Sequence, residues 1–131
     1  MIVDTSVWSL ALQRRSPVDA PETEALTELI ETGKAMMIGP VRQEILSGVR
    51  YTVQFDRLRS ALSAFPDEPI ASSDYVEAAR ICNKCHDSGV LIGNTICLVA
   101  AMAIVREWEI LTLDPGFKKL TSVVKIPIYT P

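Results

Sequence analysis

The sequence predicts an α/β domain of three layers, α/β/α, in which a central, mostly parallel sheet lies between helices on both faces. Three observations support this prediction. Short apolar runs alternate with longer amphipathic segments along the whole chain, as in successive strand–helix–strand units. The 131 residues suffice for one hydrophobic core. The chain also contains no internal repeat or low-complexity tract, so we expect a single domain over residues 1–131.

The first half of the chain contains two short apolar runs and three segments with helical periodicity. The apolar runs, expected to be strands, are Met1–Asp4 and Ala35–Ile38. The expected helices are Pro21–Thr32, Pro40–Leu46 and Val53–Phe65. Each helix is followed by a residue that ends helices, and these residues are Gly33, Gly48 and Pro66.

The second half continues the same alternation. One helix is expected from a cap at Ser73 or Asp74 to about Ser88, and Gly89 then separates it from the apolar run Val90–Ile92. A very apolar helix follows, capped by Asn94 or Thr95 and reaching Val105. The expected strands are Ile110–Leu113, which ends at Asp114, and Val123–Ile126, which Pro127 closes.

Two acids follow predicted strands directly, and a third lies early in a helix. Asp4 and Asp114 end their strands, and ligands of open parallel sheets bind beyond the carboxyl ends of the strands. Glu44, near the start of the helix after the second strand, is within reach of the same edge. Three carboxylates at one edge repel one another unless a divalent cation neutralises them, so the sequence indicates a metal site.

Each acid also has an ordinary structural explanation. Asp4 can cap the segment that follows it, and Glu44 can belong to a solvated helix face. Asp114, with Pro115 and Gly116, can form a turn. The coincidence of all three acids at one edge favours the metal site over these alternatives.

Four segments of the chain together resemble PIN-domain ribonucleases of the VapC-like toxin type. The segments are VDTSVW, VRQEILSG, IGNTICLVAA and LTLDPGF, in this order and at the family's separations. The resemblance implies a PIN-like fold, RNA cleavage with Mg²⁺ or Mn²⁺, and a role as the toxin of a type II toxin–antitoxin pair. It also implies that Asp4, Glu44 and Asp114 bind metal and act in catalysis, with Thr112 as a polar support. An antitoxin partner and a homodimer are expected on the same ground.

One position departs from the family pattern. Where the family has an acid before a Cys-Leu-Ile-Ala-like run, this chain has Ile96 before Cys97. Loss of that ligand is expected to weaken metal binding. Asn94 and Thr95 carry oxygens that can partly replace it, although capping of the helix is the favoured role for both. The alternative function is therefore a catalytically weakened module that binds RNA or antitoxin without efficient cleavage.

The charge composition neither supports nor excludes a nuclease. The formal net charge of −3 argues against a protein that binds nucleic acid chiefly through a basic surface. Carboxylates gathered to bind a metal ion themselves add negative charge to the protein. The metal ion, rather than a basic surface, then contacts the phosphate. Arg14, Arg15 and Arg42 are near the acids in sequence and are candidate phosphate contacts.

Residues 82–86, Cys-Asn-Lys-Cys-His, match the pattern of covalent haem attachment. The sequence favours a different interpretation, because the motif lies in the last turns of a regular helix. No secretory leader or membrane span is recognisable, and the three cysteines give no disulfide framework. We therefore expect a cytoplasmic protein without haem and without a membrane partner. Trp8 and Trp108 are interpreted as packing residues rather than as surfaces for stacking bases.

Overall fold

Segments from distant parts of the chain pair in parallel to form the central sheet. The computed structural model describes residues 1–12 and 20–131. The central strands β1 (Ile2–Val3) and β2 (Ile110–Leu111) are parallel, with Ile2 opposite Ile110 and Val3 opposite Leu111. Three parallel bridges extend the sheet outward, Ile2 with Met36, Met37 with Asp67, and Ile110 with Ile128. The predicted parallel sheet is confirmed, although its regular strands are only two residues long.

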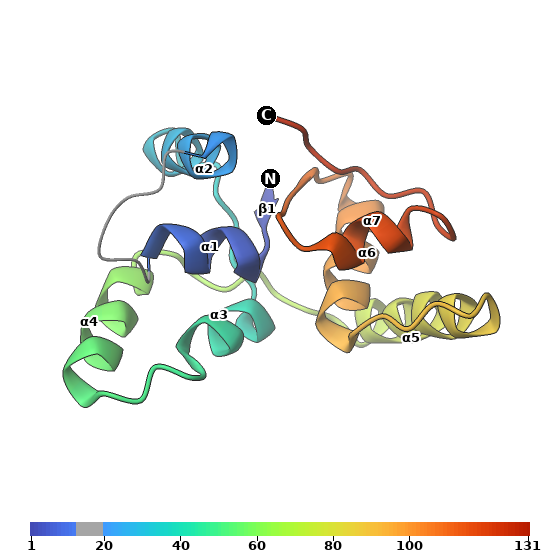
Figure 1. Cartoon of the computed structure of the whole chain (residues 1–131), viewed down its shortest axis with the longest axis horizontal. Helices are drawn as coiled ribbons and strands as arrows, with labels where there is room; N and C mark the ends of the chain where they lie inside the picture. The colour runs from blue at the N-terminus through green and yellow to red at the C-terminus, as the bar shows by residue number, and fades with distance from the viewer. Residues whose placement is uncertain (13–19) are drawn as a thin grey trace.

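Seven helices surround this sheet in the described part of the chain. They are α1 (Thr5–Leu12), α2 (Pro21–Glu31), α3 (Gly39–Leu46), α4 (Thr52–Leu62), α5 (Ser72–Asp87), α6 (Asn94–Arg106) and α7 (Pro115–Leu120). In Figure 1, α1, α2 and α4 are to the left of β1, and α5, α6 and α7 are to its right. None of the described helices is long and apolar enough to cross a membrane.

The helix α6 is the most deeply buried of the described helices. All residues from Cys97 to Ala103 are buried, so the helix is enclosed on every side. It packs along α5, and its last turn leads through Trp108 into β2. The apolar composition of this segment predicted the helix correctly. Because α6 is held by the core, its first turn has a fixed place beside the carboxyl end of the sheet.

The observed elements differ from the predicted ones at three places. The helices α1 and α7 were not predicted, and the strand expected at Val123–Ile126 is absent. The N–H groups of Val123 and Val124 both donate to Leu120 O, in the turn that ends α7. The sheet is completed two residues beyond the predicted strand, where Ile110 N–H donates to Pro127 O and Tyr129 N–H donates to Ile110 O.

Candidate functional site

The three predicted acids line one pocket at the carboxyl end of the central strands. The pocket has a volume of about 380 Å³. Asp4 follows β1, Asp114 follows the segment after β2, and Glu44 comes from α3. The other described lining residues are Thr5, Ser6, Gly93, Asn94, Thr95 and Ile96. No lysine or arginine is among them, so the pocket has three formal negative charges and no basic side chain among its described residues.

Asp4 is held in place by hydroxyl groups rather than by a cation. Its side chain is 4% exposed. Oδ2 accepts hydrogen bonds from Ser6 Oγ at 2.7 Å, Thr112 Oγ1 at 3.0 Å and Ser6 N at 3.3 Å. No described residue donates to Oδ1. These bonds fix the orientation of the carboxylate and leave one oxygen available to a ligand in the pocket.

The same hydroxyl groups explain why β2 ends where it does. Leu113 N–H donates to Ser6 Oγ at 2.9 Å, and Asp114 N–H donates to Thr112 Oγ1 at 2.9 Å. The backbone after Leu111 is therefore bonded to side chains instead of continuing the sheet. The observed strand β2 is therefore two residues shorter than the predicted strand Ile110–Leu113. Thr112 contacts both Asp4 and Asp114, as the predicted supporting role requires.

Asp114 and Glu44 also have one oxygen each in a local bond. Asp114 is the N-cap of α7, and its Oδ1 accepts from Gly116 N at 2.8 Å. Thr5 Oγ1 donates to Glu44 Oε1 at 3.4 Å, and Glu44 is exposed. No described residue donates to Asp114 Oδ2 or Glu44 Oε2. The capping and metal-binding interpretations of Asp114 are thus compatible, because each uses a different oxygen.

The first turn of α6 also lines the pocket. Gly93 is its N-cap residue, and no side chain makes a capping bond there. The expected capping role of Asn94 and Thr95 is therefore wrong, and both residues line the pocket instead. Ile96 also lines the pocket, and an added Cβ on Gly116 would lie 2.6 Å from Ile96 Cδ1. The isoleucine consequently packs against the start of α7.

The acids share a pocket without forming a closed ligand shell. Among residues 1–12 and 20–131, no three acid, histidine or cysteine side chains are grouped closely enough to hold an ion by themselves. Mutual repulsion of the carboxylates favours this spacing. Mg²⁺ usually keeps several waters and is bound through one or two carboxylates, so spaced acids with free oxygens suit it. The hard oxygen donors of this pocket fit such a hydrated divalent ion better than a soft metal.

Ser6 and Thr5 are site residues that the sequence interpretation missed. Ser6 is bonded both to Asp4 and to the backbone of Leu113, so it connects the two central strands. A local signal existed, because a serine two residues after an aspartate readily donates to the aspartate side chain. The contact with Leu113 had no sequence signal, because the two residues are 107 positions apart.

Arg42, a candidate phosphate contact, has its donors engaged elsewhere. Its guanidinium donates to Asp67 Oδ1 at 2.9 Å, to Leu62 O at 3.0 Å and to Phe65 O. These bonds connect α3 to the end of α4 and the segment beyond it. The geometry assigns Arg42 a structural role. Arg14 and Arg15 lie outside the described residues.

The two tryptophans pack within the protein. Trp8 is fully buried, and its ring meets that of Phe65 edge-on with centroids 5.0 Å apart. Trp108 is half-buried, and the Arg106 guanidinium lies 5.3 Å from its ring centroid. Neither ring lines the acidic pocket, in agreement with their interpretation as packing residues.

The Cys-Asn-Lys-Cys-His motif lies on α5, where its two cysteines face protein. Cys85 is fully buried, and burial raises the pKa of its thiol. The Cys82 thiol donates to Cys97 on α6, with 2.6 Å between the sulfurs. Burial, followed by the hydrogen bond from Cys82, raises the pKa of the Cys97 thiol to about 12. A fully buried Cys85 is not accessible for covalent attachment of haem.

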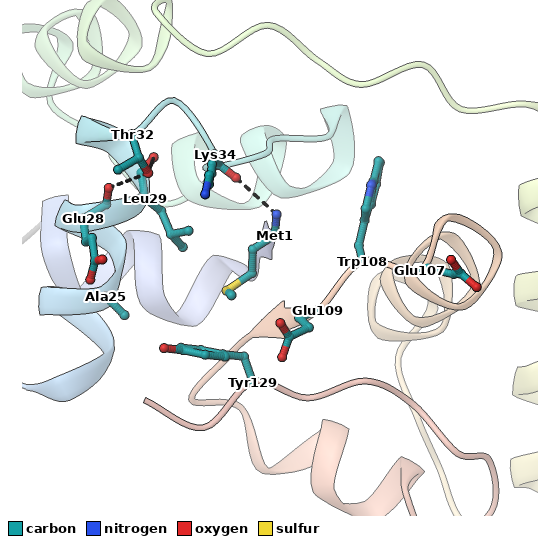
Figure 2. Close-up of a pocket in the computed structure, with 10 residues that line it drawn as sticks. All are labelled: Met1, Ala25, Glu28, Leu29, Thr32, Lys34, Glu107, Trp108, Glu109 and Tyr129. Atoms are coloured by element: carbon teal, nitrogen blue, oxygen red, sulfur yellow. Dashed lines mark hydrogen bonds between the residues drawn. The ribbon is translucent and has the colours of Figure 1, made fainter.

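A second pocket, of about 400 Å³, lies at the opposite, amino end of the strands (Figure 2). Its lining includes Glu28, Glu107 and Glu109, and also Lys34 and the Met1 amino group. The Met1 amino group donates to Lys34 O at 3.2 Å. Figure 2 shows Glu107 and Trp108 at the far side of the pocket from Glu28. Acids and cations are mixed here, so this pocket lacks the uncompensated charge of the carboxyl-end pocket.

Comparison with known proteins identifies the class of fold and then the family. The chain shares its fold with FitAcB from Neisseria gonorrhoeae, with a TM-score of 0.75 and 16% sequence identity over 98% of this chain and 96% of that chain. No curated protein is detectably similar. The PIN domain family model matches residues 1–122, and the chain therefore belongs to the PIN domain family. PIN domains are generally nucleases, and they typically use divalent metal ions.

Proposed function

We propose that this protein is a Mg²⁺- or Mn²⁺-dependent endoribonuclease and the toxin of a type II toxin–antitoxin pair. The observation that carries the proposal is the pocket in which Asp4, Glu44 and Asp114 meet at the carboxyl end of the sheet without a basic residue among the described lining. The resemblance of the motifs to VapC-like toxins implies metal ligands at the same three positions, and membership of the PIN domain family supports this assignment. A divalent ion bound there lowers the pKa of a water toward neutrality and offsets charge on the phosphate.

The protein's own residues provide positioning in this proposal. Thr112 and Ser6 hold Asp4 by its Oδ2, so the orientation of the carboxylate is fixed and no described residue occupies Oδ1. Asp114 is held by its capping bond to Gly116 in the same way. Hydrogen bonds that orient metal ligands typically change metal affinity or activity by about 10- to 100-fold. Thr112 and Ser6 are therefore positioning residues for the metal ligands.

The start of α6 is suited to receive the phosphate of an RNA substrate beside the metal. Cys97 N–H donates to Gly93 O at 3.2 Å, which is the first backbone bond of this helix. The preceding N–H groups, those of Thr95 and Ile96, have no acceptor within the helix. Both residues line the same pocket as the acids, and a helix N-terminus favours an anion. The pocket thus pairs a cation site with an anion site.

The toxin role includes a protein partner, a cognate antitoxin, and a cytoplasmic location. Large apolar side chains remain exposed on the chain, and they include Tyr51, Val53, Leu91 and Val105. These side chains are candidate contacts for either an antitoxin or a second copy of the chain. Size-exclusion chromatography coupled to light scattering, with the chain alone, tests for the homodimer.

The second candidate function is a binding module with weakened catalysis. It is favoured by Ile96, which lines the pocket where the family pattern has an acid and packs against Gly116. We expect Ile96→Asp to bind Mn²⁺ more tightly and to cleave RNA at least about tenfold faster, a difference of about 1.4 kcal/mol in barrier. If the unmodified chain cleaves well and Ile96→Asp brings no gain, the fourth ligand comes from another residue.

The deciding experiment measures metal-dependent cleavage of a mixed RNA substrate by the purified chain and by Glu44→Gln. Glu109→Gln is the matched control, because Glu109 is an exposed acid at the other end of β2. We expect cleavage that requires Mg²⁺ or Mn²⁺, a large loss in Glu44→Gln and no change in Glu109→Gln. Cleavage that persists in EDTA, or an equal effect of both substitutions, contradicts the proposed metal site. Metal binding without cleavage favours the binding module.

A further inference from the structure

Two cysteines from different helices are in contact beside the acidic pocket. Cys82 on α5 and Cys97 on α6 are 15 residues apart in sequence, and their sulfurs lie 2.6 Å apart. The two side chains are therefore direct neighbours across the contact between α5 and α6, as the two partners of a disulfide must be. We propose that Cys82 and Cys97 form a redox-modification site, at which a peroxide converts the two thiols into a reversible disulfide that lowers activity at the acidic pocket.

The two thiols differ in accessibility in the way that such a reaction requires. Cys82 is half-buried, whereas Cys97 is fully buried. Both line a pocket of about 510 Å³ between α5 and α6. A small oxidant entering this pocket reaches Cys82 first, and Cys97 is in position to resolve the product. Accessible thiols next to a resolving cysteine are typical of redox sensors.

The chemistry balances with hydrogen peroxide as the two-electron oxidant. The Cys82 thiol gives up its proton and its sulfur attacks one peroxide oxygen; the O–O bond breaks, Cys82 becomes a sulfenic acid, and the departing hydroxide takes up the proton and leaves as one water. Cys97 sulfur then attacks the Cys82 sulfur, the S–O bond breaks, and the hydroxyl group departs as a second water with the thiol proton. Two thiols are oxidised, one peroxide is reduced, and a thiol reductant reverses the change by exchange.

The site is coupled to the acidic pocket through the first turn of α6. Asn94 and Thr95 line both pockets, so they form the shared wall. The Cys82 thiol also lies 3.8 Å from Asn94 Oδ1 and 3.9 Å from Ile92 O. Oxidation removes this S–H donor and draws Cys97 toward α5. In this proposal, the movement of Cys97 and the loss of the donor to Asn94 change the position of the first turn of α6 relative to the acids. This regulatory step rests on the proposed function of the acidic pocket.

The first test measures the disulfide itself, without reference to activity. The full chain is treated with stoichiometric hydrogen peroxide, and its three cysteines are counted by thiol titration and peptide mapping. We expect the three free thiols to fall to one, with a crosslink between Cys82 and Cys97 that dithiothreitol reverses. Cys82→Ser is expected to form no intramolecular crosslink. Cys85→Ala is the matched control on the same helix and is expected to behave like the unmodified chain.

Two further measurements separate the disulfide from its consequence. The oxidised chain is expected to melt about 5 °C or more above the reduced chain in EDTA, because the crosslink constrains the unfolded state. Its Mn²⁺-dependent cleavage of RNA is expected to fall at least threefold and to recover on reduction. A crosslink that involves Cys85, or oxidation of Cys82 to sulfinic acid without a crosslink, overturns the modification site. A correct crosslink with unchanged cleavage overturns the regulatory step alone. A correct crosslink in a chain that never binds Mn²⁺ contradicts the proposed function instead.

Discussion

Two aspartates are equally buried in this protein, and their surroundings are opposite. Asp4 and Asp74 are each 4% exposed. Asp74 receives two hydrogen bonds of 2.8 Å from the Arg106 guanidinium, one to each carboxylate oxygen, and a third from Ala71 N. Asp4 receives its bonds from the hydroxyls of Ser6 and Thr112 and from backbone, and no described basic residue pairs with it.

The difference indicates what each acid does. A buried carboxylate is costly unless a charge compensates it. The Arg106 guanidinium compensates the charge of Asp74, and this ion pair joins the start of α5 to the end of α6. Asp4 has two further acids in its pocket instead, Glu44 and Asp114. The structure therefore assigns Asp74 to stability, and the surroundings of Asp4 favour an external cation. Each prediction below tests one side of this comparison.

The largest effect is expected from removal of the charge of Asp74. We expect Asp74→Asn to lower the free energy of unfolding by about 3 kcal/mol, because it leaves the partly buried Arg106 without its ion pair. Chemical denaturation at neutral pH measures this change. Asp87→Asn is the control, since Asp87 is an exposed acid at the end of the same helix, and its effect is expected to stay within about 0.5 kcal/mol. Equal effects of the two substitutions are incompatible with a structural ion pair.

The corresponding change at Asp4 is expected to affect activity rather than stability. Asn retains an oxygen that accepts from Thr112 and Ser6, so Asp4→Asn keeps the local bonds and loses only the charge. We expect metal-dependent cleavage to fall about 100-fold, equivalent to about 2.7 kcal/mol in barrier. Stability in EDTA is expected to be unchanged or slightly higher. Cleavage kinetics and denaturation of the same sample provide the two readouts. A loss of stability comparable to that of Asp74→Asn eliminates the distinction between the two aspartates.

The pH dependence of stability measures how much of the free energy of unfolding comes from the charge of Asp74 in its ion pair with Arg106. The hydrogen bonds from Arg106 lower the pKa of Asp74 below its ordinary value of 3.8, against the opposing effect of burial. The stabilisation is therefore complete above the unfolded-state pKa and is lost as the pH falls through the lower folded-state pKa. We expect the stability advantage over Asp74→Asn to be constant near neutral pH and to shrink below about pH 4 by up to about 1.4 kcal/mol per pH unit. An advantage that is as large at pH 2 as at neutral pH contradicts an electrostatic origin.

The sequence was sufficient for the features that depend on local pattern. The apolar run from Cys97 to Ala103 predicted α6, and the position of Asp4 and Asp114 after apolar runs predicted that they meet at one sheet edge. Two short helices were not predicted, α1 with 8 residues and α7 with 6, and the start of α7, Asp114-Pro115-Gly116, was interpreted as a possible turn. Both helices are stabilised by packing of buried residues such as Trp8 and Phe117.

Pairings between distant residues were beyond the reach of sequence patterns. Arg106 and Asp74 are 32 positions apart, and Ser6 and Leu113 are 107 positions apart. Each contact depends on how the helices pack on the sheet, and a single sequence has no periodic signal for it. The sequence interpretation consequently named Asp4 but not Ser6, and it considered Asp74 only as a helix cap.

The smallest effect is expected from Asp114, where removal of charge should stabilise the metal-free protein. Asn is as good an N-cap as Asp, so Asp114→Asn keeps the bond to Gly116 N that begins α7. The substitution removes one of three like charges in the pocket. We expect the melting temperature in EDTA to rise by about 2 °C, measured by calorimetry. With Mn²⁺ the order should reverse, because ligand binding stabilises the unmodified chain more. A melting temperature that falls in EDTA indicates that the three carboxylates do not repel one another. In that case Asp4 needs no external cation, and the proposed difference between Asp4 and Asp74 disappears.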